Sequence, residues 1–274
     1  MTDHHFETHE PVDLQIEIGK GSVKVTCTDT TETRIVVEGR EAEETRVEQH
    51  GSRIDVIAPQ QRGGFFGGNA ELHVTAVVPT ASNVAAKTGS ADVTVDGDAG
   101  SVAVKSGSGD VEIATARGAS LVETGSGDIT VGHAQDALRV KSGSGDVKLG
   151  HGGGEVAVST GSGDVEIGTS RSAAVVKTGS GDLRVDESYD DVSLATGSGD
   201  FVIDHAHRGR LTVKGASGDV LVGIPAGLPV WTDLSTVSGS IRSSLEGAGQ
   251  PAEGEDHIEL RAKTVSGDIV LTQI

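Results

Sequence analysis

The sequence predicts an all-β fold, a single-stranded parallel β-solenoid (β-helix) with about 18 residues and two strands per coil and irregular β caps at both ends. The first observation is a repeat of Ser/Thr-Gly-Ser-Gly/Ala-Asp, and a short fixed period of this kind is typical of a chain that coils on itself. The second is a composition of 40 glycines, 6 prolines and 2% aromatic residues, which suits many turns around an aliphatic core. The aspartates of the repeat recur at a constant spacing, at Asp92, Asp110, Asp128, Asp146, Asp164, Asp182 and Asp200.

Two strands are expected in each coil. Val111 and Ile113 follow Asp110, and this alternation of apolar and polar residues indicates a strand with one buried face. A second alternation, such as that of Val102 and Val104, falls about half a coil away. Stacked coils should therefore place equivalent residues in columns and pair each strand with the coils above and below.

The Gly-Ser-Gly-Asp segments are predicted to form the corners of the coils. Glycine suits a tight corner with positive φ, and the aspartate can accept hydrogen bonds from backbone amides there. The predicted structural turn glycines are Gly107, Gly109, Gly125, Gly127, Gly143, Gly145, Gly161, Gly163, Gly179, Gly181, Gly197 and Gly199.

A column of carboxylates about 5 Å apart also raises a cation hypothesis, because like charges at that spacing repel each other. Calcium is the hard cation that such oxygens would bind. The candidate ladder is Asp110, Asp128, Asp146, Asp164, Asp182 and Asp200. Turn capping is favoured over calcium, since the motif is one residue shorter than the nonapeptide calcium repeats and occupies one half-coil only. We expect no metal, no cofactor and no catalytic residue.

The repeat argues for one domain with modified ends. The expected organisation is a flexible tail at 1–10, then one β-solenoid over 11–274, with an irregular cap at 11–80, regular coils at 81–222, and C-terminal coils at 223–274 that include a mobile loop at 246–256. Phe65 and Phe66 in a glycine loop are expected to fold back over the open core; the alternative is insertion into a partner or a membrane. Trp231 is expected to plug the core.

Charge and targeting signals restrict the partners. The net charge of −19 disfavours nucleic acid and anionic membranes. No apolar run approaches the length needed to span a bilayer, the start lacks the features of a secretory signal, and Cys27 alone excludes an internal disulfide. We therefore expect a cytoplasmic protein without membrane insertion, whose partner is another protein.

The coils and the C-terminal segment together resemble the bacterial putative-adhesin family of β-strand repeat proteins, a domain family of unknown function. In the C-terminal segment the resemblance lies in Trp231, Ser243-Ser244-Leu245, the segment 259–264, and Gly267-Asp268-Ile269. It covers nearly the whole chain and implies a β-repeat fold without catalytic residues. Some relatives are linked to envelope stress, which the resemblance extends to this chain as an expectation.

Three functions follow as hypotheses. The preferred one is a non-enzymatic protein-binding or scaffolding module; the alternative is an exported putative adhesin or cell-surface binding module. A carbohydrate-acting β-helix enzyme is a remote alternative, because one Trp and one Tyr offer few platforms for a sugar.

The strand-like C-terminus, Asp268 to Ile274, would leave a free edge unless another segment covers it, such as the loop 246–256. We expect mainly a monomer, with a weak end-to-end dimer.

Overall fold

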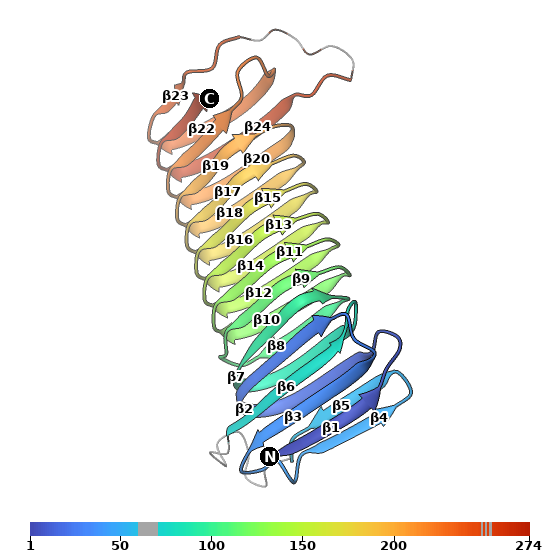
Figure 1. Cartoon of the computed structure of the whole chain (residues 1–274). Helices are drawn as coiled ribbons and strands as arrows, with labels where there is room; N and C mark the ends of the chain where they lie inside the picture. Colours follow the sequence, from blue (N-terminus) through green and yellow to red (C-terminus); the bar gives the residue numbers. More distant parts are fainter. Residues whose placement is uncertain (60–70, 248, 250, 252–253) are drawn as a thin grey trace. The chain divides into compact units, whose positions relative to one another are not determined.

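The computed structural model describes residues 1–59, 71–247, 249, 251 and 254–274. All their helix and strand elements are β-strands, so this part of the chain contains no helix that could cross a membrane. The chain is divided into two compact units, Met1–Asp136 and Ala137–Ile274. The all-β parallel solenoid predicted from the sequence is confirmed, because strands of successive coils lie parallel, side by side (Figure 1).

The described residues of unit 1 form eleven strands, shown from blue to green in Figure 1. They are β1 (Thr2–Glu7), β2 (Asp13–Thr28), β3 (Glu32–Gly39), β4 (Arg46–His50), β5 (Arg53–Ile57), β6 (Glu71–Pro79), β7 (Asn83–Ala99), β8 (Val102–Ser106), β9 (Val111–Ala116), β10 (Ser120–Ser126) and β11 (Ile129–Ala134). From β7 onward the coils are regular, and β8 and β9 pair in parallel with β10 and β11.

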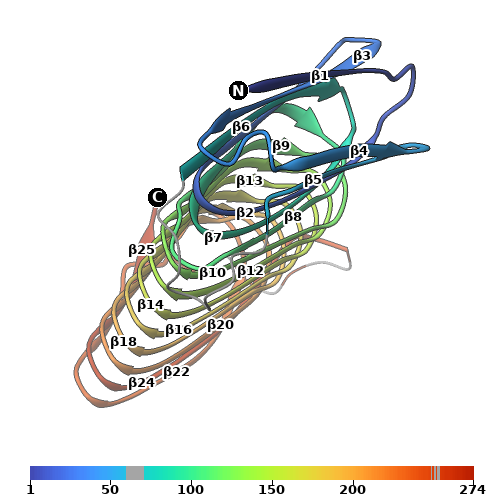
Figure 2. The same ribbon diagram turned by 90° about the horizontal axis from the view of Figure 1, so that it is seen from below.

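The N-terminal end of unit 1 combines parallel coils with antiparallel strands (Figure 2). Strand β2 runs parallel to β7 along its length and pairs on its other side with β5 and β6. Strands β4 and β3 then add antiparallel to β5 and β6, and β1 adds antiparallel to β3. Antiparallel additions end the growth of a parallel stack and reduce the exposed edge.

The flexible tail predicted at 1–10 is wrong for residues 2–7, which form β1. The strand is anchored by side chains as well as by backbone pairing. Arg34 donates two hydrogen bonds to the Asp3 carboxylate, at 3.0 and 2.8 Å, and the His5 ring lies 2.5 Å from Glu32. These cross-strand ion pairs give a short polar segment a register on the edge of β3.

Unit 2 continues with two strands per coil. Its strands are β12 (Leu138–Ser144), β13 (Val147–Gly152), β14 (Val156–Ser162), β15 (Val165–Ser170), β16 (Ala174–Ser180), β17 (Leu183–Ser188), β18 (Val192–Ser198), β19 (Phe201–Ala206), β20 (Gly209–Ser217), β21 (Val220–Ile224), β22 (Val230–Ser238), β23 (Ile241–Ser243), β24 (Ile258–Ser266) and β25 (Ile269–Gln273). Val156 pairs with Ala174, its equivalent in the next coil, and both are buried.

The last coils of unit 2 do not follow sequence order. Strands β24 and β25 pair with β20 and β21 on one side and with β22 and β23 on the other. The C-terminal coil therefore lies between two coils that precede it in sequence. Another segment does cover the strand-like C-terminus, because β23 pairs with β25, whereas the expected cover was the loop 246–256. The terminal coil is the one formed by β22 and β23.

Trp231 does not plug the core as expected. It lies on β22 opposite Glu259 and is 53% exposed, while the neighbouring residues Val230 and Thr232 stand opposite the buried Ile258 and Leu260. Strand alternation turns Trp231 to the outer face. The predicted positions of Phe65 and Phe66 lie outside the described residues, as do residues 248, 250, 252 and 253 of the predicted loop 246–256.

Candidate functional site

The aspartate column caps the corners of the coils. In unit 1 the Asp92 carboxylate accepts a hydrogen bond from the Asp110 N–H at 3.0 Å, and Asp110 accepts one from the Asp128 N–H at 2.9 Å. In unit 2 the same bond joins Asp146, Asp164, Asp182, Asp200 and Asp219 to the amides of the next coils, all at 2.8 or 2.9 Å. Each carboxylate thus bonds to the corner of the neighbouring coil.

The capping hydrogen bonds join coils that are neighbours in space, even where they are not neighbours in sequence. Asp219 accepts from the Asp268 N–H, and Asp268 accepts from the Ser240 N–H, both at 2.8 Å, so the capping continues through the displaced C-terminal coil. The hydrogen bond from Ser240 is the main cause that lowers the pKa of Asp268 below 3.8. Among the described residues, no group of three or more His, Cys, Asp or Glu side chains is arranged to hold a metal ion.

The two glycines of each corner have different roles. In unit 2 the second glycine has a φ that only glycine readily adopts, for example +139° at Gly163 and +138° at Gly181. Gly179, a first glycine, lies in a strand without a left-handed φ, and a Cβ there would be 2.5 Å from the Gly161 carbonyl oxygen. Positive φ was therefore the wrong reason for the first glycines, which are needed for close backbone approach.

In unit 1 the second glycines lack the left-handed φ. A Cβ on Gly127 would lie 2.4 Å from the carbonyl oxygen of Gly109, so the corner is again closed to a side chain. Gly107 and Gly125 repeat this restriction, because a Cβ on Gly125 would lie 2.5 Å from the Gly107 carbonyl oxygen. These glycines are structural and offer no functional group.

A different corner of unit 2 carries the chain's only tyrosine in a stack of planar side chains. Tyr189 and His207 occupy the same position of successive coils, just after β17 and β19, and their rings are parallel within 6° with centroids 4.3 Å apart. The Arg171 guanidinium, at the same position of the coil before Tyr189, lies 5.1 Å from the centroid of the tyrosine ring. The coil repeat thus orders a cation, a phenol and an imidazole into one column.

A hydrogen bond keeps the phenol of this stack protonated. The Tyr189 hydroxyl donates to Glu187 at 2.6 Å, and this bond raises the pKa of Tyr189. The phenol therefore holds its proton at neutral pH and is a poor general base. His207 Nε2 is buried without a hydrogen-bond partner among the described residues and lies 3.8 Å from Glu187.

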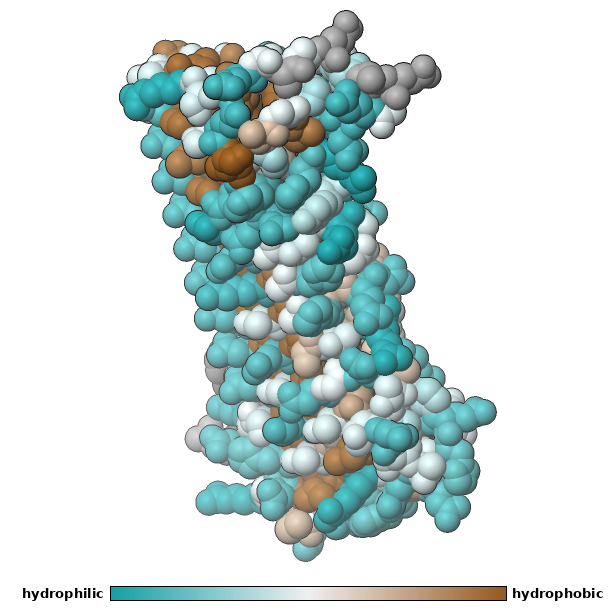
Figure 3. All heavy atoms as spheres, turned by 45° about the horizontal axis from the view of Figure 1, so that its top comes forward, coloured by the Kyte–Doolittle hydropathy of each residue, from teal (hydrophilic) through white to brown (hydrophobic). Residues whose placement is uncertain are grey.

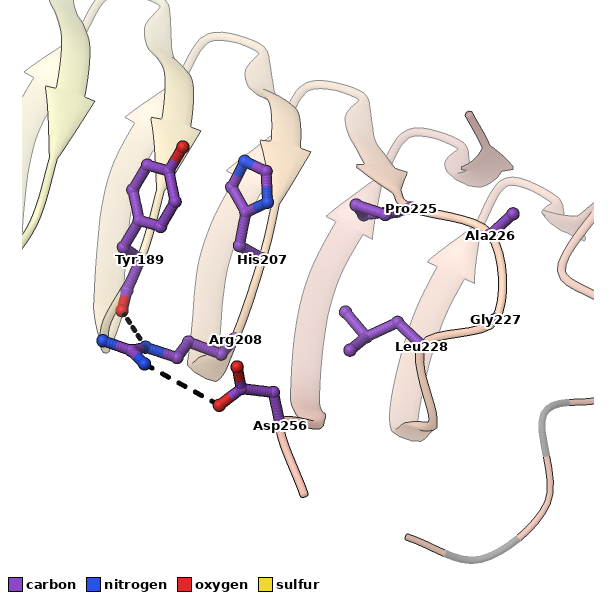
Figure 4. Close-up of a pocket in the computed structure, with 8 residues that line it drawn as sticks. All are labelled: Tyr189, His207, Arg208, Pro225, Ala226, Gly227, Leu228 and Asp256. Carbon is purple, nitrogen blue, oxygen red and sulfur yellow. Dashed lines mark hydrogen bonds and ion pairs between the residues drawn. The ribbon is translucent and has the colours of Figure 1, made fainter. Parts of the chain in front are cut away.

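A cleft with a volume of about 410 Å³ opens beside the stack (Figure 4). Tyr189 and His207 form one wall, and the turn 225–228 forms the other. At its base Arg208 donates to the Tyr189 carbonyl oxygen at 2.7 Å and lies 3.8 Å from the Asp256 carboxylate. The cleft therefore combines flat and apolar walls with a cation and an anion, which suits a partner's side chain carrying both apolar and polar atoms.

This corner was missed in the sequence. Its signal was present as Arg171, Tyr189 and His207 at the same position of three consecutive coils. The turn 225–228 and Asp256 belong to segments that lost the regular period, so no spacing rule could have placed them beside that column.

The model of the Toastrack DUF4097 family matches residues 12–272. This chain belongs to that family. The resemblance to β-strand repeat proteins of unknown function is thereby confirmed. The Toastrack match spans both units and the displaced C-terminal coil. No curated protein matches the chain.

Solved structures similar to this Toastrack chain come from several bacteria. A putative adhesin from Bacteroides fragilis is 14% identical, with a TM-score of 0.36, over 99% of this chain and 96% of that chain. A putative lipid binding protein from Parabacteroides distasonis is 10% identical, with a TM-score of 0.37, over 100% and 96%. A putative cell adhesion protein from Clostridium sporogenes is 11% identical, with a TM-score of 0.27, over 100% and 99%.

Proposed function

We propose that this Toastrack chain is a non-catalytic protein-binding or scaffolding module of the bacterial cytoplasm, and that a partner protein binds at the cleft beside Tyr189 and His207. The observation that carries the proposal is the planar stack next to a cleft of about 410 Å³. Aromatic and arginine side chains dominate the energetics of protein interfaces, and they are most effective beside a pocket that excludes water.

The composition of the chain supports this location. Aromatic residues form only 2% of the sequence, and the regular corners present glycine, serine and aspartate. A repeated corner of that kind offers no particular coil to a partner, whereas the stack marks one corner of unit 2. The raised pKa of Tyr189 and its bond to Glu187 favour a binding surface over an acid–base centre.

Site-specific photocrosslinking in cells tests the proposal. A photoreactive residue at Leu228, on the lip of the cleft, should give a discrete crosslinked protein, while the same residue at Lys148, a 64% exposed side chain on β13, should not. The Arg208→Ala variant should remove the product, because the guanidinium lies at the base of the cleft. Equal products at both positions, or none at Leu228, would contradict the proposed site.

Fractionation tests the compartment separately. Recovery of the full chain in the cytoplasmic fraction, together with the Leu228 crosslink, is the expected result. Recovery of the chain on the outer side of the cytoplasmic membrane would instead support the exported, surface-binding alternative, whatever protein the cleft binds.

A further inference from the structure

Among the described strands of unit 2, the terminal coil has an edge that no other strand pairs with. Strand β22 pairs with β24 from Val230↔Ile258 to Ser238↔Ser266, and no other described strand pairs with it. The coil also exposes large apolar side chains: Trp231 is 53% exposed, Val237 81% and Ile241 47%. Apolar side chains gather at this end in the surface view (Figure 3). Such an edge is a template for a further strand.

The backbone groups available at this edge follow from the existing ladder. The Ile258 N–H donates to the Pro229 carbonyl oxygen at 3.0 Å. In a parallel pair, alternate residues turn both backbone groups to the same side, so Trp231 and Asp233 face β24. Thr232 and Leu234 therefore turn their N–H and C=O groups to the open edge.

A second copy of β22 complements this edge in one antiparallel register. Leu234 is the middle residue of the strand Val230–Ser238, so a two-fold axis at Leu234 places each strand fully alongside the other. Trp231 of one copy then lies opposite Val237 of the other, twice across the axis. These are non-hydrogen-bonded positions, where facing side chains are closest.

Neighbouring registers are less favourable. An axis at Asp233 would place two carboxylates directly opposite each other, which destabilises a pair of strands. An axis at Ser235 would move Trp231 beyond the partner strand and place Asp233 opposite the apolar Val237. The register centred on Leu234 avoids both and covers the half-buried inner residue of each open coil.

We propose that two copies of this chain associate end to end through antiparallel pairing of their β22 strands, centred on Leu234. The contact is separate from the cleft beside Tyr189, so either can exist without the other. With a net charge of −19 on each chain, added salt screens the repulsion and strengthens the dimer.

Single cysteines in the full chain test the register. Under mild oxidation Leu234→Cys should give a disulfide-linked dimer, because the two residues at the axis face each other. Asp233→Cys and Ser235→Cys should crosslink much less, since each is the self-facing residue of a rejected register. The native Cys27 is buried, and burial raises its pKa to about 11, so the wild-type chain serves as the uncrosslinked control.

Sedimentation equilibrium at several salt concentrations tests the dimer without a crosslink. Val237→Asp should weaken it about tenfold or more by replacing two apolar contacts, and it should fold normally because Val237 is exposed. Thr232→Pro should abolish it by removing an N–H at the open edge while leaving the bonds to β24. Ser235→Ala should leave it unchanged.

Three results would overturn the proposal. The first is a wild-type chain that stays monomeric at every concentration and salt level. The second is a dimer that Thr232→Pro leaves intact while melting curves show a folded variant. The third is preferential crosslinking at position 233 or 235, which would show another register.

Discussion

Replacing Gly181 by alanine should be among the most destabilising single-methyl changes in unit 2. Its φ is +138°, a conformation that costs a non-glycine residue about 1–3 kcal/mol. The new Cβ would lie 2.2 Å from the Gly163 carbonyl oxygen, so the corner must move. That movement strains the Gly181 N–H bond to Ser198 at 2.9 Å and the Asp182 N–H bond to Asp164 at 2.8 Å, each worth about 1 kcal/mol.

The sum is a loss of about 3–5 kcal/mol in the free energy of unfolding. Two matched alanine variants separate its causes. Gly227→Ala tests φ alone, because its φ is +81° with no atom within 4 Å of the new Cβ, and it should cost about 1–2 kcal/mol. Gly161→Ala tests close approach alone, since its Cβ would lie 2.5 Å from the Gly143 carbonyl oxygen without a left-handed φ. Gly161→Ala should lower the free energy of unfolding by more than Gly227→Ala and by less than Gly181→Ala.

Urea unfolding followed by circular dichroism measures all three losses, with the slope of each transition checked against the wild type. Equal losses in Gly181→Ala and Gly227→Ala would refute the role given to the neighbouring carbonyl. A loss below about 1 kcal/mol in Gly181→Ala would refute the tight corner itself.

Three further outcomes are expected. Asp182→Ala should lower the free energy of unfolding by about 0.5–1.5 kcal/mol, because it leaves the Asp200 N–H without its acceptor, and Asp182→Asn should cost less. Millimolar calcium should leave the melting temperature of the wild type nearly unchanged, whereas a saturable rise abolished by Asp→Asn changes would support a calcium ladder instead. Because the folded-state pKa of Asp268 is lowered, the stability that its carboxylate contributes is complete above the unfolded value of 3.8 and is lost as pH falls through the folded value. Acid should therefore release β22 and β23 first, and Asp268→Asn should flatten this pH dependence in a titration followed by Trp231 fluorescence. Trp231 emission should be red-shifted and readily quenched by acrylamide in the monomer, and a blue-shifted, protected signal at low protein concentration would contradict its exposed position.

The regular coils were predictable because one local pattern specifies them repeatedly. Each aspartate marks a corner, and the alternating residues after it, such as Val165 and Ile167, are buried in the same columns as their counterparts. The ends were not predictable by the same means. Their strands pair with partners distant in sequence, as β1 does with β3 and β22 with β24, and no period records those pairings.

The candidate site shows the same division. Tyr189 and His207 could have been placed together from their spacing of one coil, because coil position determines the column. The second wall of the cleft could not, since residues 225–228 follow the last regular coil. The prediction for Trp231 was wrong because strand alternation turns its side chain to the outer face, opposite to the face that carries Thr232 and Leu234.

The displaced C-terminal coil imposes an order on the maturation of the chain. A solenoid emerging from a ribosome can add each coil to the one before it, and unit 2 can do so through β21. Residues 230–243 must then wait, because the strands with which they pair, β24 and β25, are synthesised after them. Strands β24 and β25 thus insert between two coils that were made earlier. A nascent chain that stops short of them carries a strand, with Trp231 on it, that has no partner strand.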